Sequence, residues 1–183
     1  MILRRCFPLD ERARTRSPGG PLWFPRPYQG DGRHDNRTVY GCLYVTEREE
    51  SAVVEWLAPV RGSVFTPAML VREGRPLSLA AIELPDDAEL VDLDEPQVLL
   101  REGLRPSLVA TGNRLVTQQQ ALRIFREHAS AAGIRWWSTH EAGWINVTLF
   151  DRVRTSLRLA GLRALTLEDP AVTAATDFLG MTP

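Results

Sequence analysis

Short blocks of apolar residues, separated by polar segments, predict strands along most of the chain. Runs of apolar, aromatic and β-branched residues are typical of strands, and turn-forming residues flank most of them. The strands are predicted over residues 1–8, 40–46, 77–84, 89–93, 134–138 and 145–150.

Helical spacing of apolar residues appears in three places. The first predicted helix covers residues 47–58, where Pro59 ends it and Thr46 or a neighbour caps it. Its apolar face consists of Ala52, Val53, Trp56 and Leu57. The last predicted helix, near residues 168–179, starts at Glu168-Asp169-Pro170, which suits a first helical turn.

The second predicted helix starts at Thr117, because Thr117 and Gln120 have the spacing of a capping box. Gly133 is its expected C-terminal cap. The apolar face of this helix is expected to bury Leu122, Phe125, Ala129 and Ala132. Because no regular strand–helix–strand repeat links the predicted elements, the pattern favours an α+β fold over a doubly wound sheet.

Two segments without a period predict loops. Residues 10–22 are polar and rich in Pro and Gly, so an exposed loop is expected. Residues 23–38 mix aromatic residues, Arg and Gly, which indicates a structured loop. The length of 183 residues suits one domain over 1–183.

The charges exclude several classes of function. All 22 basic residues are arginines and 23 residues are acidic, so the net charge is −1. A balanced charge argues against direct binding to nucleic acid or to an anionic membrane. The absence of lysine excludes a Schiff-base mechanism.

The expected location is the cytoplasm. The first twenty residues lack the apolar segment of a secretory signal, and no apolar run has the length of a membrane span. Cys6 and Cys42 have no metal or redox spacing, so reduced thiols are expected. His34, His128 and His140 show no ligand spacing either, and no metal site is predicted. His128 is interpreted as a residue of the polar face or the cap of its helix.

Glu55 is the first residue with unusual placement. It lies at the border of the apolar face of the first predicted helix, where a carboxylate is partly desolvated. Two interpretations stay open. Glu55 is either a rim glutamate that reaches solvent or a carboxylate that faces a cleft.

Arg33 is the second, in the segment Gly30-Asp31-Gly32-Arg33-His34-Asp35-Asn36. Two glycines permit a sharp turn and a close approach by another group. An arginine on a tight loop suits bidentate binding of phosphate. The alternative is a loop arginine paired with Asp31 or Asp35.

Ser138 is the third, at the end of the aromatic strand Arg135-Trp136-Trp137. A serine there could lie at the mouth of a pocket. No nucleophile elbow surrounds it, so a hydrolase nucleophile is not expected. The paired tryptophans fit the core on both faces of a strand better than a stacking platform.

An ordered set of short segments makes the chain resemble the RES domain family, which is named for an Arg, a Glu and a Ser. The resemblance covers roughly residues 2–152. The segments that carry it are Gly32-Arg33-His34-Asp35-Asn36, Tyr40-Gly41-Cys42-Leu43-Tyr44, Ala52-Val53-Val54-Glu55, Thr117-Gln118, Trp137-Ser138 and Asn146-Val147-Thr148-Leu149-Phe150.

The resemblance implies a fold like that of ADP-ribosyltransferases, with two small sheets and flanking helices around an NAD cleft. Residues 153–183 would then be a C-terminal extension with a short strand and a helix. It also implies a bacterial toxin that consumes NAD⁺ as substrate by phosphorolysis or hydrolysis of the nicotinamide–ribose bond. No cofactor would be bound permanently. The implied partner is a small antitoxin with an Xre-type DNA-binding domain, which blocks the cleft.

The resemblance also implies residue roles. Arg33, Glu55 and Ser138 would be the catalytic set, with Glu55 opposing the developing ribosyl cation and Arg33 holding the pyrophosphate. These three residues and Tyr44 are expected to line one pocket. The substrate-binding set would be Arg33, Tyr44, Asn146 and, through a weaker match, Arg5.

The chain departs from many family toxins in one place. An aromatic residue and Asn follow the arginine in those proteins, whereas His34-Asp35-Asn36 follows Arg33 here. Three hypotheses therefore stay open: an NAD⁺-degrading enzyme, a protein ADP-ribosyltransferase, and a non-catalytic domain that binds a nucleotide or a partner.

Overall fold

The structure is a computed structural model that describes residues 1–182. Contacts within the chain divide it into two compact units, each built from separated segments. Unit 1 comprises Met1–Trp23, Val45–Glu83 and the region from Arg158 onward, and unit 2 comprises Phe24–Tyr44 and Leu84–Leu157.

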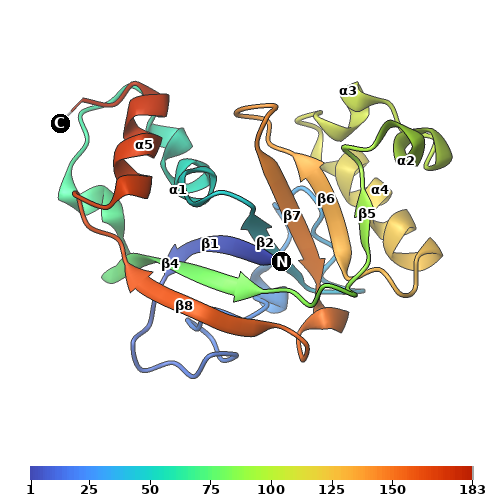
Figure 1. Cartoon of the computed structure of the whole chain (residues 1–183), viewed down its shortest axis with the longest axis horizontal. Coiled ribbons are helices and arrows are strands. Elements are labelled where there is room, and N and C mark those ends of the chain that lie inside the picture. Colours follow the sequence, from blue (N-terminus) through green and yellow to red (C-terminus); the bar gives the residue numbers. More distant parts are fainter. Residues whose placement is uncertain (183) are drawn as a thin grey trace. The chain divides into compact units, whose positions relative to one another are not determined.

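Unit 1 is a small antiparallel sheet with two helices. Strand β4 (Arg75–Glu83) pairs with β1 (Ile2–Pro8), β3 (Val71–Arg72) and β8 (Arg158–Ala164). Strand β2 (Cys42–Thr46) starts in unit 2 and ends in unit 1, where Thr46 pairs with Arg4 of β1. Helices α1 (Glu49–Leu57) and α5 (Pro170–Leu179) pack side by side (Figure 1). Two short 3₁₀ segments cover Ala58–Val60 and Pro67–Leu70.

Unit 2 contains three further strands beside three helices (Figure 1). Strand β6 (Gly133–Trp137) pairs in parallel with β5 (Leu90–Asp92) and antiparallel with β7 (Ile145–Phe150). The helices are α2 (Pro96–Arg101), α3 (Pro106–Val109) and α4 (Arg114–Glu127). Short 3₁₀ segments cover Arg26–Tyr28 and Asp151–Val153.

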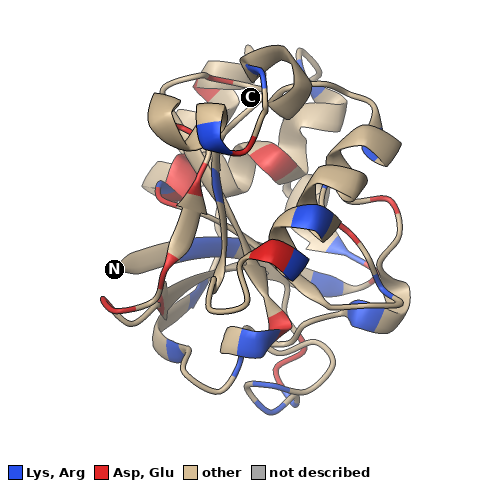
Figure 2. Ribbon diagram, turned by 90° about the vertical axis from the view of Figure 1, so that its right-hand side faces the viewer, with Lys and Arg blue, Asp and Glu red and all other residues tan. Residues whose placement is uncertain are grey.

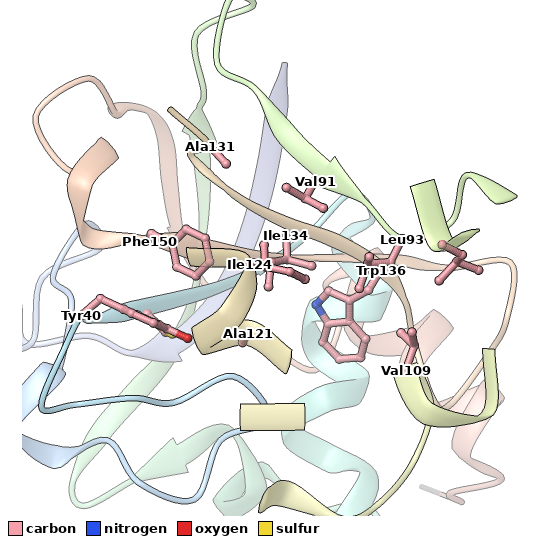
Figure 3. Packing of buried hydrophobic residues seen from close by; sticks show 12 residues of the cluster. Tyr40, Val91, Leu93, Val109, Ala121, Ile124, Ala131, Ile134, Trp136 and Phe150 are labelled. Carbon is pink, nitrogen blue, oxygen red and sulfur yellow. The ribbon is translucent and has the colours of Figure 1, made fainter. Parts of the chain in front are cut away.

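The core of unit 2 joins its sheet to its helices. Figure 3 shows Ile124 of α4 beside Ile134 of β6, both fully buried. Tyr40 stacks on Phe125 of α4 at 4.3 Å between ring centres and meets Phe150 edge-on at 4.8 Å. These aromatic contacts fix the segment before β2 against α4.

The expectation of an α+β fold is confirmed, and most predicted strands lie within two residues of their observed bounds. Asp169 caps α5 through the N–H of Ala171, as the acidic start with Pro170 predicts. The short helices α2 and α3 and the strand β3 were not predicted. None of the helices in residues 1–182 combines the length and apolar character needed to cross a bilayer.

The predicted start of the second helix is wrong. Helix α4 begins at Arg114, and its N-cap is Asn113, whose side chain accepts the N–H groups of Leu115 and Val116. Thr117 is buried inside the helix, where its hydroxyl donates to the carbonyl of Arg33. Thr117, which has the spacing of a capping box, therefore makes a tertiary contact with the Arg33 loop and does not cap the helix.

The predicted end of that helix is also wrong. Helix α4 ends at Glu127, and His128 is its C-cap, as its interpretation as a capping residue allowed. Gly133 instead begins β6, where a Cβ would lie 2.2 Å from the carbonyl oxygen of Thr148. A glycine is needed at this position because the neighbouring strand β7 lies too close for a side chain. Ala129, expected in the buried face, is exposed because the helix stops before it.

The expected cap of α1 is not formed. Arg48 occupies the N-cap position without a capping hydrogen bond from its side chain, and the hydroxyl of Thr46 donates to the carbonyl of Arg48. Acidic side chains in the first turn, Glu49 and Glu50, favour the helix start instead, because they oppose the positive end of the helix dipole.

Candidate active site

The backbone N–H groups around Arg33 converge on two side chains. Gly30 and Gly32 donate to Asp35 Oδ2 at 2.9 and 2.8 Å. His34 donates to the Tyr44 hydroxyl oxygen at 2.9 Å, and that hydroxyl donates to Asp35 Oδ1 at 2.7 Å. The Asp35 carboxylate and the Tyr44 phenol thus accept the N–H groups of alternate residues of this loop.

The carbonyls of the same loop are held by the first turns of α4. Gln118 Nε2 donates to the carbonyls of Gly30 and Gly32, both at 2.9 Å. Thr117 Oγ1 donates to the carbonyl of Arg33 at 2.6 Å. The loop is therefore fixed from both sides of its backbone.

Only one of the two glycines is required by a close approach. A Cβ on Gly32 would lie 2.5 Å from the Tyr44 hydroxyl and 2.6 Å from Asp35 Oδ1. A Cβ on Gly30 would meet nothing within 4 Å. The expected close approach is thus confirmed at Gly32, because Asp35 and Tyr44 occupy the space that a Cβ would need.

The guanidinium of Arg33 is anchored as well as its backbone. Its Nη1 donates to the carbonyls of Val109 and Thr111, both at 2.8 Å, and its Cζ lies 4.9 Å from the centre of the Trp136 ring. Arg33 is 6% exposed. Arg33 is therefore held by backbone carbonyls and an aromatic ring, and its pairing with Asp31 or Asp35 stays a prediction.

His34 is a buried, neutral neighbour of this arginine. Its Nδ1 lies 2.8 Å from Thr148 Oγ1, and its ring meets Trp136 edge-on at 5.3 Å. Burial, followed by the charges of Arg33 and Arg114, lowers the pKa of His34 to about 3. A second positive charge is thereby kept away from Arg33 at neutral pH. In the sequence, the only signal for this effect of His34 on Arg33 is that the two residues are adjacent.

Ser138 and Asn146 come from neighbouring strands. Ser138 follows β6 directly and is 2% exposed, and its hydroxyl accepts the N–H of His140 at 3.1 Å. Asn146 of β7 is 4% exposed and lies opposite Trp136 in the strand register. Unit 2 thus brings both residues to the β6–β7 pair that also carries the Arg33-stacking ring.

Glu55 and Arg5 belong to unit 1. Glu55 is exposed on α1, which agrees with the interpretation of a rim glutamate that reaches solvent. The helix is oriented by Trp56, whose indole N–H donates to the carbonyl of Cys6 at 2.6 Å. Arg5 donates to the carbonyls of Gly20 and Pro21. That Glu55 and Arg33 line one pocket stays a prediction.

The N-terminal end of α1 is tied into a charged network of unit 1. Arg163 contacts Glu49 at 2.6 Å and Asp169 at 2.8 Å, and Arg4 lies 3.4 Å from Glu49. The hydrogen bonds from Arg163 lower the pKa of Glu49 and of Asp169. These contacts link the helix that carries Glu55 to β8 and to the cap of α5.

A polar pocket of about 480 Å³ is lined in part by residues of the Arg33 loop. Asp35 and Gln118, which hold the loop backbone, also contribute to its wall. Its lining consists of Tyr28, Gln29, Gly30, Asp31, Asp35, Asn36, Arg37, Thr38 and Gln118.

A second cluster of titratable groups forms at the end of α4. Glu102, Glu127 and His128 bring one potential metal-binding atom each to within 4.8 Å of one another. Arg123 already contacts Glu102 at 3.2 Å and Glu127 at 2.8 Å. We interpret the cluster as an ion-pair network that anchors α2 and its C-terminal turn to α4, because this guanidinium supplies the positive charge.

The fold and the site define an α+β protein with an arginine held rigidly on a glycine loop. A chain of the M. tuberculosis MbcT–MbcA toxin–antitoxin complex shares this fold, with a TM-score of 0.64 and 18% sequence identity over 90% of this chain and 84% of that chain. The architecture is thus of the ADP-ribosyltransferase-like type that the resemblance implied. A search of curated proteins finds no match.

The family follows from the sequence itself. The family model of the RES domain matches residues 3–168, and the chain belongs to the RES domain family. The match extends beyond the segments that suggested it and includes β8.

Proposed function

We propose that this protein is an NAD⁺-consuming enzyme that cleaves the nicotinamide–ribose bond by phosphorolysis or hydrolysis, as the toxin of a toxin–antitoxin pair. The observation that carries the proposal is the anchored Arg33 in a chain that matches the RES domain over residues 3–168. A rigid guanidinium loses little conformational freedom when it binds a diphosphate.

Arg33 binds the pyrophosphate of the substrate in this proposal. Its backbone and one guanidinium nitrogen are held before the ligand arrives. Neutral His34 adds no competing charge, since burial keeps its pKa near 3. Ser138 and Asn146 supply neutral hydrogen-bonding groups that orient the substrate beside Trp136.

Glu55 acts on the reacting sugar. When nicotinamide leaves, the ribose gains the character of an oxocarbenium ion, and a carboxylate stabilises that cation more than it stabilises the ground state. Nicotinamide departs as a neutral molecule from a cationic ring, so no general acid is needed. The exposure of Glu55 on α1 leaves its carboxylate accessible to a ligand.

The experiment follows nicotinamide release from NAD⁺ by the purified protein, with and without inorganic phosphate. Release that depends on phosphate, together with a phosphorylated ADP-ribose product, supports phosphorolysis. Release without phosphate, together with free ADP-ribose, supports hydrolysis. Release only when a protein acceptor is added, with label transfer to that acceptor, would instead favour an ADP-ribosyltransferase. Binding of NAD⁺ without release would favour a non-catalytic domain.

The toxin role predicts a protein partner. One structural neighbour is a chain of a toxin–antitoxin complex, and the family resemblance implies an antitoxin with an Xre-type domain. Figure 2 shows basic and acidic segments interspersed along the ribbon, which agrees with the net charge of −1. Binding of DNA is therefore assigned to the partner. Growth arrest on expression of this chain, relieved by coexpression of a small helix-turn-helix protein encoded beside it, tests the role.

A further inference from the structure

We infer that Tyr44 and Asp35 act as a pair of positioning residues for Arg33, and that the Tyr44 hydroxyl gives no hydrogen bond to a ligand. The inference rests on the proposed function, because it assigns these side chains a part in how Arg33 meets the substrate phosphates. It leaves open the expectation from the family resemblance that Tyr44 belongs to the substrate-binding set through its ring, and it assigns the hydroxyl to the loop.

The hydrogen-bonding capacity of the hydroxyl carries the first step. A phenol has one proton to donate, and the proton of Tyr44 goes to Asp35 Oδ1 at 2.7 Å. The same oxygen accepts the N–H of His34, the residue that follows Arg33, at 2.9 Å. The proton that the hydroxyl would need to donate to a substrate is already used inside the protein.

The geometry of Asp35 carries the second step. Its Oδ2 accepts the N–H groups of Gly30 and Gly32, so Asp35 and Tyr44 bind the loop immediately before and after Arg33. Asp35 is 7% exposed, and Gly32 has no space for a Cβ against this pair. Burial, with the nearby Cys42 and Asp35, raises the pKa of Tyr44, so its hydroxyl keeps the proton that joins the two side chains.

The test compares Tyr44→Phe with a matched control, Tyr40→Phe. Both variants remove a buried hydroxyl that has two partners near the loop. The Tyr40 hydroxyl donates to the carbonyl of His34, and Asn36 Nδ2 and Cys42 Sγ also reach that carbonyl. The N–H of His34 donates to the Tyr44 hydroxyl, whereas three groups share the carbonyl of His34, so Tyr44→Phe frees the loop more than Tyr40→Phe.

Two readouts are measured, the steady-state constants of nicotinamide release and the hydrogen exchange of the amides of residues 30–36. A buried N–H without its partner costs about a factor of ten or more in local stability. Tyr44→Phe should therefore raise KM for NAD⁺ about tenfold, change kcat by less than about threefold, and speed amide exchange at His34 about tenfold. Tyr40→Phe should change each value by less than about threefold.

A second variant, Asp35→Asn, covers the case in which Tyr44→Phe fails to fold. After an amide flip, the Asn oxygen accepts the two glycine N–H groups and the Asn amide donates to the Tyr44 hydroxyl. KM for NAD⁺ should then rise above the wild-type value by less than about tenfold, with faster amide exchange at residues 30–36, and unchanged KM and exchange would contradict the inference. In the double variant, the combined effect should fall short of the product of the single effects, because the two residues act on one loop.

Three results would overturn the inference. One is a Tyr44→Phe enzyme with unchanged KM and unchanged exchange. Another is a fall in kcat alone, which would place the hydroxyl at the reacting atoms. The third is equal loop exchange in the two Tyr→Phe variants. Failure of the wild-type protein to release nicotinamide would refute the proposed function instead, and amide exchange would still decide whether Tyr44 and Asp35 hold the loop.

Discussion

Removing the imidazole of His34 should make the protein less sensitive to acid. His34 is 3% exposed and neutral in the folded state, where burial and the charge of Arg33 lower its pKa to about 3. In the unfolded chain, histidine has its usual pKa of about 6.5. Between these two pKa values the unfolded state binds more protons than the folded state. Stability therefore falls as the pH falls through this window.

The size of the effect follows from the shift. Each pH unit inside the window costs about 1.4 kcal/mol, so lowering the pH from 7.5 to 4.5 should cost about 2.5 kcal/mol through His34 alone. Glu49 and Asp169 act in the same direction, because contacts with Arg163 lower their pKa values in the folded state. The contribution of His34 is isolated by comparison with His34→Gln, which keeps these carboxylates and cannot titrate.

The assay is urea unfolding of both proteins at intervals from pH 4.5 to 7.5, followed by tryptophan fluorescence and circular dichroism. The variant should be less stable at pH 7.5, because a buried contact with Thr148 is altered. The stability difference between the two proteins should then shrink by about 2.5 kcal/mol as the pH falls to 4.5. Parallel pH profiles would refute the assignment of a buried neutral histidine.

Four further predictions concern the loop, the carboxylate and the α4 cap. Glu55→Gln should lower the rate of nicotinamide release about 10²–10³-fold with an unchanged melting curve, because the residue is exposed, and equal activity would remove Glu55 from the mechanism. Arg33→Ala should raise KM for NAD⁺ at least as clearly as it lowers kcat, and an unaltered KM would argue against phosphate binding. Gly32→Ala should destabilise the fold and raise KM, measured by urea unfolding and nicotinamide release, whereas Gly30→Ala, which has open space, serves as the control. Asn113→Ala should lower the free energy of unfolding by about 1 kcal/mol, and Asn113→Asp should retain most of it.

Local signals explain how much of the site the sequence could predict. The Gly-x-Gly segment before Arg33 indicated a sharp turn with a close approach by another group, and the structure confirms the close approach at Gly32. The position of Glu55 within its helix was predicted, but the sequence left two environments open for its carboxylate, and the structure shows the residue exposed. Helical periodicity places a residue relative to its own helix, whereas exposure also depends on what packs beside that helix.

The tertiary contacts of the loop could not be predicted. Thr117 and Gln118 fit a capping box by spacing, yet they hold the carbonyls of Gly30, Gly32 and Arg33. A hydroxyl or amide near a helix start has the same sequence pattern in both roles. Asn113 caps the helix instead, so the hydroxyl of Thr117 donates to the loop.

The sequence by itself determined the class of the protein and the identity of its chemical groups. Periodicity predicted the α+β elements, the balance of charges argued against nucleic-acid binding, and an ordered set of short segments identified the RES family, because these properties depend on residue type and order. Only the tertiary structure decided which partners each polar group has. It placed Asp35 and Tyr44 on alternate N–H groups of the loop and made His34 neutral, because hydrogen bonding and desolvation depend on segments that meet only when the chain folds.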